Sequence, residues 1–154
     1  MNQFFYDELK CASTAISACK VNPGVYAGDE INIIGDEHSL NAYLAGFFML
    51  TAKNNKSGRV NIIAEGKVRN QSLITEVISE FKGGPTLTVY KSIDDYLQGG
   101  SEIVNKHFFY IANLQLPEYN DEAFVAKKKA NLEKWLEVAR ECSGSFVFIP
   151  IFNF

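Results

Sequence analysis

Residues 31–42 read Ile-Asn-Ile-Ile-Gly-Asp-Glu-His-Ser-Leu-Asn-Ala, and this stretch decides the fold. A short apolar run ends at Gly35, and a polar turn follows in which Ser39 can cap a helix. The predicted helix is apolar over most of its surface and carries Leu40, Tyr43, Leu44, Phe47, Phe48 and Leu50. The stretch therefore predicts a buried strand that leads through a turn into a buried helix.

The alternation of strand and helix continues along the rest of the sequence. Further strands are predicted at 60–64, 86–90, 107–114 and 145–149, and helices at 3–19, about 70–82, after Ser92 and at about 121–142. Because these helices are long enough to cross over between parallel strands, we expect a three-layer α/β/α architecture with a mostly parallel central sheet of about five strands. We expect a single domain over 1–154, with an N-terminal helix in 1–20 and the α/β core in 28–154.

Composition supports a globular protein and limits the classes of partner. The chain has 154 residues, of which 47% are hydrophobic, enough for the core of one domain. The formal net charge is −3, and the run Lys127 to Lys129 is the only basic cluster, which we interpret as the solvated face of a helix. We therefore predict that the protein does not bind nucleic acid.

No segment of about 18 apolar residues occurs, so no membrane span is predicted. Cys11, Cys19 and Cys142 are the only cysteines and show no C-x-x-C spacing. We interpret them as reduced thiols of a cytoplasmic protein.

The turn after the first strand lies where a P-loop, G-x-x-x-x-G-K-[ST], would bind phosphate. Gly35 matches the first glycine, but Leu40, Asn41 and Ala42 stand in place of the second glycine, the lysine and the hydroxyl residue. Leu40 is bulky, Asn41 is uncharged, and Ala42 cannot bind Mg²⁺, while the adjacent Asp36 would repel phosphate. The sequence thus predicts either a P-loop that has lost its chemistry or an ordinary turn that never was one.

The second half of such a site is an apolar strand that ends in a Mg²⁺-binding aspartate. The matching strand, 108–112, is followed by Asn113 instead. We therefore predict no cofactor and no ATPase chemistry.

With these features, the layout of about residues 28–150 resembles a degenerate RecA-like or KaiC-like P-loop ATPase domain. In active members a glutamate often ends the strand after the P-loop helix and positions the attacking water, and Glu65 is similar in place. The stretch 107–150, with its aromatic strand, Ala-Asn, loop, long Trp-containing helix and aliphatic strand, is also similar in layout to the N-terminal domain of the bacterial cellulose-secretion accessory protein BcsE. A second non-catalytic relative of this fold that the chain resembles is the cell-division inhibitor SulA, which is of comparable length. RecA-like domains commonly pair side by side, so the resemblance implies a homodimer.

Other catalytic or metal chemistry is not predicted. His38 lies beside acidic residues in a turn, where neighbours rarely converge on one metal ion, and we interpret it as part of a solvated loop. His107 is interpreted as a residue at the start of a strand, and Ser145 lacks the G-x-S-x-G context of a nucleophile elbow.

The leading hypothesis is a non-catalytic regulatory or protein-interaction protein. The last strand is aromatic and little of the sequence follows to cover it, which predicts an interface at Phe146, Phe148, Phe152 and Phe154. The alternative is a small-molecule or nucleotide-binding module at the C-terminal edge of the sheet, built around Gly35, Asp36, Glu65 and Asn113, with Gly66 and Gln115 nearby. A third hypothesis is a hydrolase or transferase that uses Asp36 and Glu65.

Overall fold

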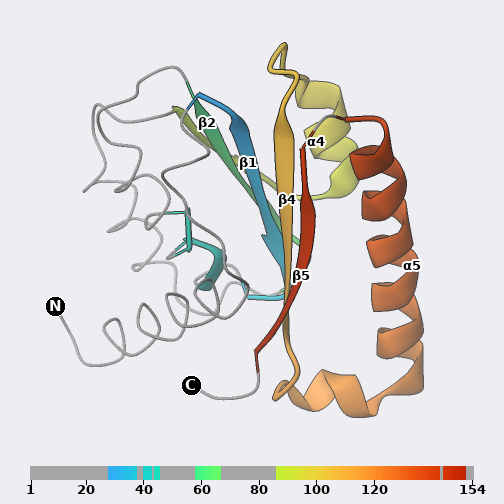
Figure 1. Cartoon of the computed structure of the whole chain (residues 1–154). Coiled ribbons are helices and arrows are strands. Elements are labelled where there is room, and N and C mark those ends of the chain that lie inside the picture. Colours follow the sequence, from blue (N-terminus) through green and yellow to red (C-terminus); the bar gives the residue numbers. More distant parts are fainter. Residues whose placement is uncertain are drawn as a thin grey trace, which may run out of the picture.

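The computed structural model describes residues 28–37, 40–42, 44–45, 58–66, 86–142 and 144–151 (Figure 1). The strands are β1 (Glu30–Gly35), β2 (Arg59–Ala64), β3 (Thr86–Tyr90), β4 (Lys106–Asn113) and β5 (Phe146–Ile151), and the helices are α4 (Ile93–Gly99), the 3₁₀ helix η2 (Pro117–Asn120) and α5 (Glu122–Arg140). Residues 40–42 and 44–45 are also helical. The predictions for 3–19 and 70–82, and those for Cys11, Cys19, His38, Phe152 and Phe154, lie outside the described residues.

The sheet has the strand order β3-β2-β1-β4-β5, and every neighbouring pair is parallel. The predicted α/β fold with a parallel central sheet is therefore confirmed. β4 is buried from His107 to Asn113, as expected of an inner strand with apolar residues on both faces. β5 pairs only with β4, so it forms one edge of the sheet described here.

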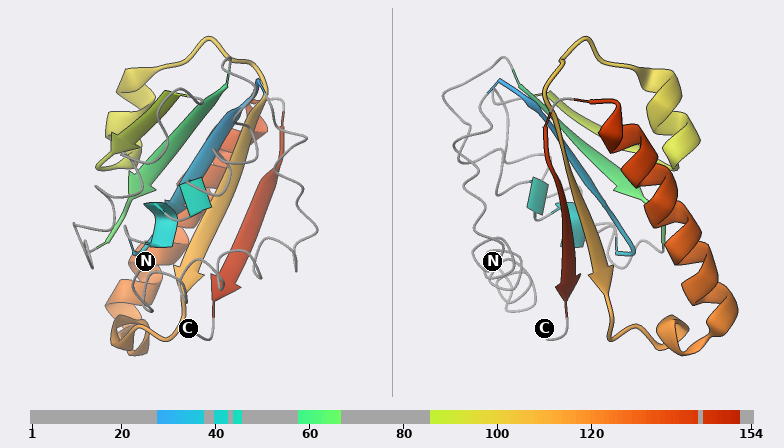
Figure 2. Two further views of the ribbon diagram at one scale, coloured as in Figure 1. Left: turned by 90° about the vertical axis from the view of Figure 1, so that its left-hand side faces the viewer. Right: turned by 45° about the vertical axis from the view of Figure 1, so that its right-hand side comes forward.

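Two layers cover the sheet, because successive strand residues point to opposite faces. Ile31 and Ile33 pack with Leu40 and Leu44 of the helical segment after β1. Ile34 lies on the other face, where Trp135 of α5 is completely buried among aromatic side chains. Figure 2 shows α4 and α5 together on this second face.

The connection from β4 to β5 is the best-defined crossover. The single-turn helix η2 (Pro117–Asn120) forms within the loop that the sequence predicts between the aromatic strand and the long helix. Asp121 then caps α5, since its side chain accepts a hydrogen bond from the Ala123 amide at 2.9 Å. Within the described part of the chain, no helix is both long and apolar enough to cross a membrane.

Candidate functional site

The structure brings the predicted edge residues together at the carboxyl ends of three adjacent strands. Gly35 ends β1 and Asp36 follows it, Glu65 follows β2, and Asn113 ends β4. These ends meet because all three strands are parallel and β1 lies between the other two. Ligands of open α/β sheets bind at such an edge, so this is the first place to look for function.

Two glycines at this edge are required by close backbone contacts. A Cβ atom on Gly35 would lie 2.2 Å from the carbonyl oxygen of Ile111, and one on Gly66 would lie 2.0 Å from that of Asp36. The turn after β1 is thus packed tightly against its neighbouring strands. Packing against β4 is sufficient to explain the glycine at position 35.

Asp36 is only 3% exposed, and both of its carboxylate oxygens contact protein groups. Oδ2 accepts hydrogen bonds from the Asn113 amide nitrogen, at 3.2 Å, and from the Tyr119 hydroxyl of η2. Oδ1 forms an ion pair with the ammonium of Lys128 in α5. The carboxylate therefore joins β1 to β4, η2 and α5.

Glu65 is held in the same way. Its Oε1 accepts a hydrogen bond from the Tyr110 hydroxyl at 2.6 Å and lies 3.5 Å from Lys128 Nζ. Its Oε2 accepts a hydrogen bond from Trp135 Nε1 at 3.0 Å. We refer to Asp36, Glu65, Tyr110, Tyr119, Lys128 and Trp135 as the carboxylate cluster.

The interpretation of the whole lysine run as a solvated face is wrong for Lys128. Lys128 is only 8% exposed, and its ammonium lies between the carboxylates of Asp36 and Glu65. Lys127 and Lys129, in contrast, are exposed. Lys128 is four residues after Phe124, whose ring centroid is 5.5 Å from Nζ, and seven before Trp135. This helical spacing places Lys128 on the face that packs against the sheet, a signal that the sequence contained.

The tyrosines of the carboxylate cluster act as hydrogen-bond donors. Burial, together with the charge and hydrogen bond of Glu65, raises the pKa of Tyr110. Burial and the hydrogen bond to Asp36 raise the pKa of Tyr119. Both phenols therefore remain protonated at neutral pH and donate to a carboxylate.

The side chain of Asn113 bonds to neighbouring turn residues rather than facing an open binding site. Its side-chain nitrogen donates to Glu37 Oε1 at 3.0 Å, and its side-chain oxygen accepts from the Gln115 amide at 3.2 Å. All three residues lie at the edge predicted to bind a ligand. Their side-chain contacts, however, hold the chain after β1 against the chain after β4.

Asn41 is the exception at this edge. It is completely buried, yet neither atom of its side-chain amide has a hydrogen-bond partner among the described residues. Asn41 occupies the position at which a P-loop would carry its lysine. An unpartnered buried amide is costly and marks a place where the structure has unused hydrogen-bonding capacity.

A second buried polar group lies between the sheet and α4, and no pattern in the sequence pointed to it. Glu30 Oε2 accepts hydrogen bonds from Asn32 Nδ2 at 3.1 Å and from the Tyr96 hydroxyl at 2.8 Å. Asn61 Nδ2 donates to Asn32 Oδ1 at 2.9 Å. Asn32 and Asn61 are register partners on β1 and β2, so the strands themselves bring the two amides together.

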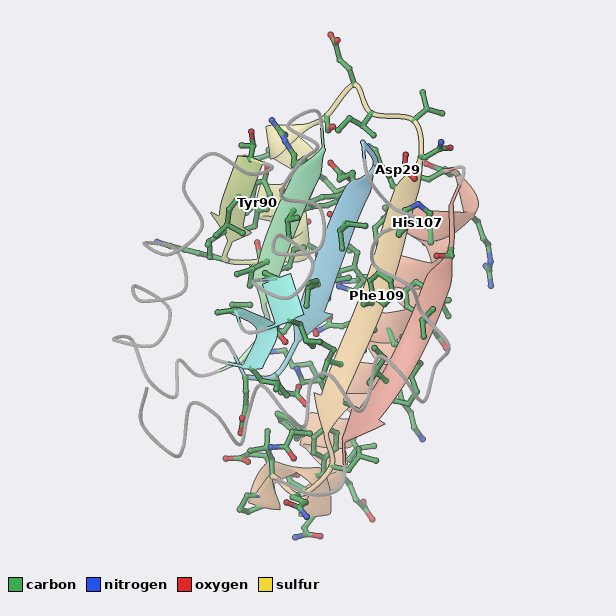
Figure 3. All side chains as sticks on the ribbon, turned by 60° about the vertical axis from the view of Figure 1, so that its left-hand side comes forward. Asp29, Tyr90, His107 and Phe109 are labelled. Carbon is green, nitrogen blue, oxygen red and sulfur yellow. The ribbon has the colours of Figure 1, made fainter. Side chains whose placement is uncertain are left out.

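His107 is more than a strand-start residue. Its Nε2 lies 2.8 Å from Asp29 Oδ2, and its Nδ1 lies 3.0 Å from Ser145 Oγ. Figure 3 shows Asp29 and His107 at the amino ends of neighbouring strands. Gly144 permits this approach, because its φ is +149° and a Cβ atom there would lie 1.9 Å from the Lys106 carbonyl oxygen.

These three residues have the composition of a serine-hydrolase triad but a different arrangement. In that triad the serine bonds to Nε2 and the carboxylate to Nδ1, whereas here the two ring nitrogens exchange partners. The group lies at the amino edge of the sheet, opposite to the edge at which α/β folds bind ligands. We interpret it as a polar link between the starts of β1, β4 and β5.

The predicted interface residues on β5 fall into two groups. Phe146 is partly buried and stacks on Phe108, with ring centroids 6.4 Å apart. Phe148 stacks on Tyr110 at 6.3 Å but is 44% exposed. Of the predicted set, Phe148 is therefore the aromatic residue that the structure leaves open to a partner, while Phe152 and Phe154 lie outside the described residues.

No family model, curated protein or solved structure matches this chain. Among the residues that the structure describes, no group of three or more side chains is arranged to hold a metal ion. The geometry defines an α/β protein with a parallel sheet, in which the protein's own side chains occupy the edge formed by the carboxyl ends of the strands.

Proposed function

We propose that this protein is a non-catalytic regulatory or protein-interaction protein, built on a RecA-like scaffold whose phosphate- and Mg²⁺-binding residues have been lost. One observation carries the proposal. Every carboxylate oxygen of Asp36 and Glu65 already contacts a donor or the ammonium of this chain.

A carboxylate that acts as a general base or binds a metal needs an oxygen directed at its substrate or ligand. In this protein both carboxylates point into the interior and hold α5 and η2 onto the sheet. To expose them, the ion pairs with Lys128 would have to break, which costs several kcal/mol for buried partners. The geometry thus favours a structural role for the acids over the hydrolase or transferase hypothesis.

The surface supports the interaction half of the proposal. β5 is an edge strand that carries the half-exposed Phe148, and unpaired edges with aromatic side chains are typical surfaces for strand addition. We propose that the protein acts in the cytoplasm, in keeping with the free thiol of Cys142.

Isothermal titration of the full chain with ATP, ADP and GTP, with and without Mg²⁺, tests the non-catalytic proposal. We expect no saturable heat and no release of phosphate. Saturable binding of a nucleotide, or its hydrolysis, would overturn the proposal.

The small-molecule or nucleotide-binding module remains the second candidate, and Asn41 is the observation that favours it. Its unpartnered amide could bond to a ligand that reaches the helix after β1. A surface hollow of about 310 Å³ lies at a separate place, between residues of η2 and α5, and Asn41 does not line it. A thermal-shift screen discriminates, because a ligand of the Asn41 site stabilises the wild type but not Asn41→Ala or Asp36→Ala.

A further inference from the structure

The edge of β5 that faces away from β4 has no partner strand among the described residues, and it has a defined pattern of donors and acceptors. The Phe108 amide donates to the Ser145 carbonyl at 2.8 Å, and Phe108 is the register partner of Phe146. In a parallel pair this pattern directs the backbone groups of alternate residues toward β4, beginning at Ser145. The N–H and C=O groups of Phe146 and Phe148 and the C=O of Pro150 therefore point away from the sheet.

Pro150 lies on this outer row, where its missing N–H leaves the β4–β5 ladder intact. The outer row thus offers amide donors at Phe146 and Phe148 and ends in a carbonyl alone. A proline at this position limits how far a long strand can add to the edge, which natural sheets use to prevent open-ended association. A short, closed pairing is compatible with it.

The outer row is complementary to itself when a second copy runs antiparallel. With Phe148 opposite the partner's Phe148, the Phe146 amide meets the partner's Pro150 carbonyl. With Phe148 opposite the partner's Phe146, each amide donor of one row again meets a carbonyl of the other. In the first register the Phe146 carbonyl faces the partner's Pro150, which has no N–H to donate. In the second register every outward N–H and C=O group of Phe146 and Phe148 has a partner, so the geometry favours the second register.

The side chains on this edge also favour pairing with a second copy of the chain. Residues paired across an antiparallel ladder point to the same face, so the exposed ring of Phe148 would meet an aromatic ring of the partner in either register. A two-fold axis perpendicular to the sheet relates the copies and leaves α5 of both on one face. Figure 2 shows that β5 has no described strand beyond it in the sheet.

We propose that a second copy of this chain pairs with it antiparallel along Phe146 to Pro150, to form a closed homodimer with one continuous sheet. This inference rests on the proposed interaction function and names the partner. The outer row of β5 is the interface, and Phe148, which is 44% exposed, is its central contact.

Sedimentation equilibrium of the full chain over about 1–300 μM tests the proposal with matched variants. Phe148→Lys adds charge to the edge, and Phe148→Pro removes an outward donor without touching the β4 ladder. Val104→Lys is the control, because Val104 is 70% exposed and lies in the loop before β4. Circular dichroism and thermal melting confirm that each variant is folded.

We expect a concentration-dependent dimer whose dissociation constant rises at least about 10-fold in both Phe148 variants and is unchanged in Val104→Lys. A monomer over the whole concentration range would overturn the inference. So would a dimer that folded Phe148→Lys and Phe148→Pro leave unaffected. Neither result depends on nucleotide titration, so failure here is distinguishable from failure of the non-catalytic proposal.

Discussion

The ammonium of Lys128 and the carboxylate of Asp36 form an ion pair whose side chains are only 9% and 2% exposed. The pair connects the first turns of α5 to the turn after β1, over a long separation in sequence. It lies at the edge where the fold would place a ligand, and it fills that edge with groups of the protein itself.

Lys128→Met should destabilise the protein strongly. Removing the ammonium leaves Asp36 and Glu65 buried without their cation, which costs about 3–5 kcal/mol when one partner of a buried pair is lost. Lys127→Met and Lys129→Met are matched controls, since both lysines are exposed, and should change the free energy of unfolding by less than about 0.5 kcal/mol. Urea unfolding measures all three. Equal effects at the three positions would contradict the buried ion pair.

The protein should lose stability as the pH rises above about 10. An unfolded tyrosine titrates near pH 10, and burial with neighbouring carboxylates raises the pKa of Tyr96, Tyr110 and Tyr119 in the folded state. The folded protein therefore keeps protons that the unfolded chain loses, so each tyrosine contributes stability that is complete below pH 10 and lost above it.

The slope of this loss is about 1.4 kcal/mol per pH unit for each tyrosine. Urea unfolding of the wild type between about pH 8 and 11 measures it. Tyr110→Phe should lower stability at pH 8, through the lost bond to Glu65, but should flatten the decline above pH 10. If the variant and the wild type decline in parallel, the assignment to Tyr110 is wrong.

Asn41→Leu should raise stability, although it replaces a buried residue. The side-chain amide has no hydrogen-bond partner among the described residues, so its removal recovers the desolvation penalty of an unsatisfied polar group, about 1–3 kcal/mol. Asn32→Leu is the matched control, because this equally buried amide bonds to Glu30 and Asn61, and it should destabilise. Thermal melting of both variants shows whether each substitution raises or lowers the stability of the protein. A loss of stability in Asn41→Leu would show that the amide has a partner.

The link between His107 and Ser145 should be measurable as a coupling free energy. Because the two side chains are 3.0 Å apart at Nδ1 and Oγ, a double-mutant cycle of His107→Ala and Ser145→Ala should give about 0.5–3 kcal/mol. Additive effects would argue against the hydrogen bond.

In His107, Nδ1 bonds to the serine and Nε2 to the carboxylate, which is the reverse of a catalytic triad. We therefore predict that Ser145 is not a hydrolase nucleophile. A fluorophosphonate probe should therefore leave Ser145 unlabelled in the folded protein. Labelling that disappears in Ser145→Ala would show instead that His107 activates the serine.

Much of the fold could be predicted because the signals are local. The apolar runs of β1, β2 and β4 identify buried strands, and Ser92 caps α4 by accepting a bond from the Asp95 amide, as its position suggested. The meeting of Asp36, Glu65 and Asn113 also followed from the sequence, since parallel strands place their carboxyl ends at one edge.

The contacts of these residues could not be predicted in the same way. Lys128 looked like part of a solvated run, and Tyr119 lay in a presumed loop, yet both bond to Asp36. Asp29 and His107 are 78 residues apart and meet only because β1 and β4 are neighbours.

The sequence by itself determined the order of the described strands and helices, the parallel sheet and the edge at which its acidic residues gather, because apolar periodicity and capping act over a few residues. The tertiary structure decided which polar groups are buried and what each one bonds to. Those pairings depend on strand order, on register and on where α5 and η2 lie over the sheet, and no local pattern of residues specifies these distances.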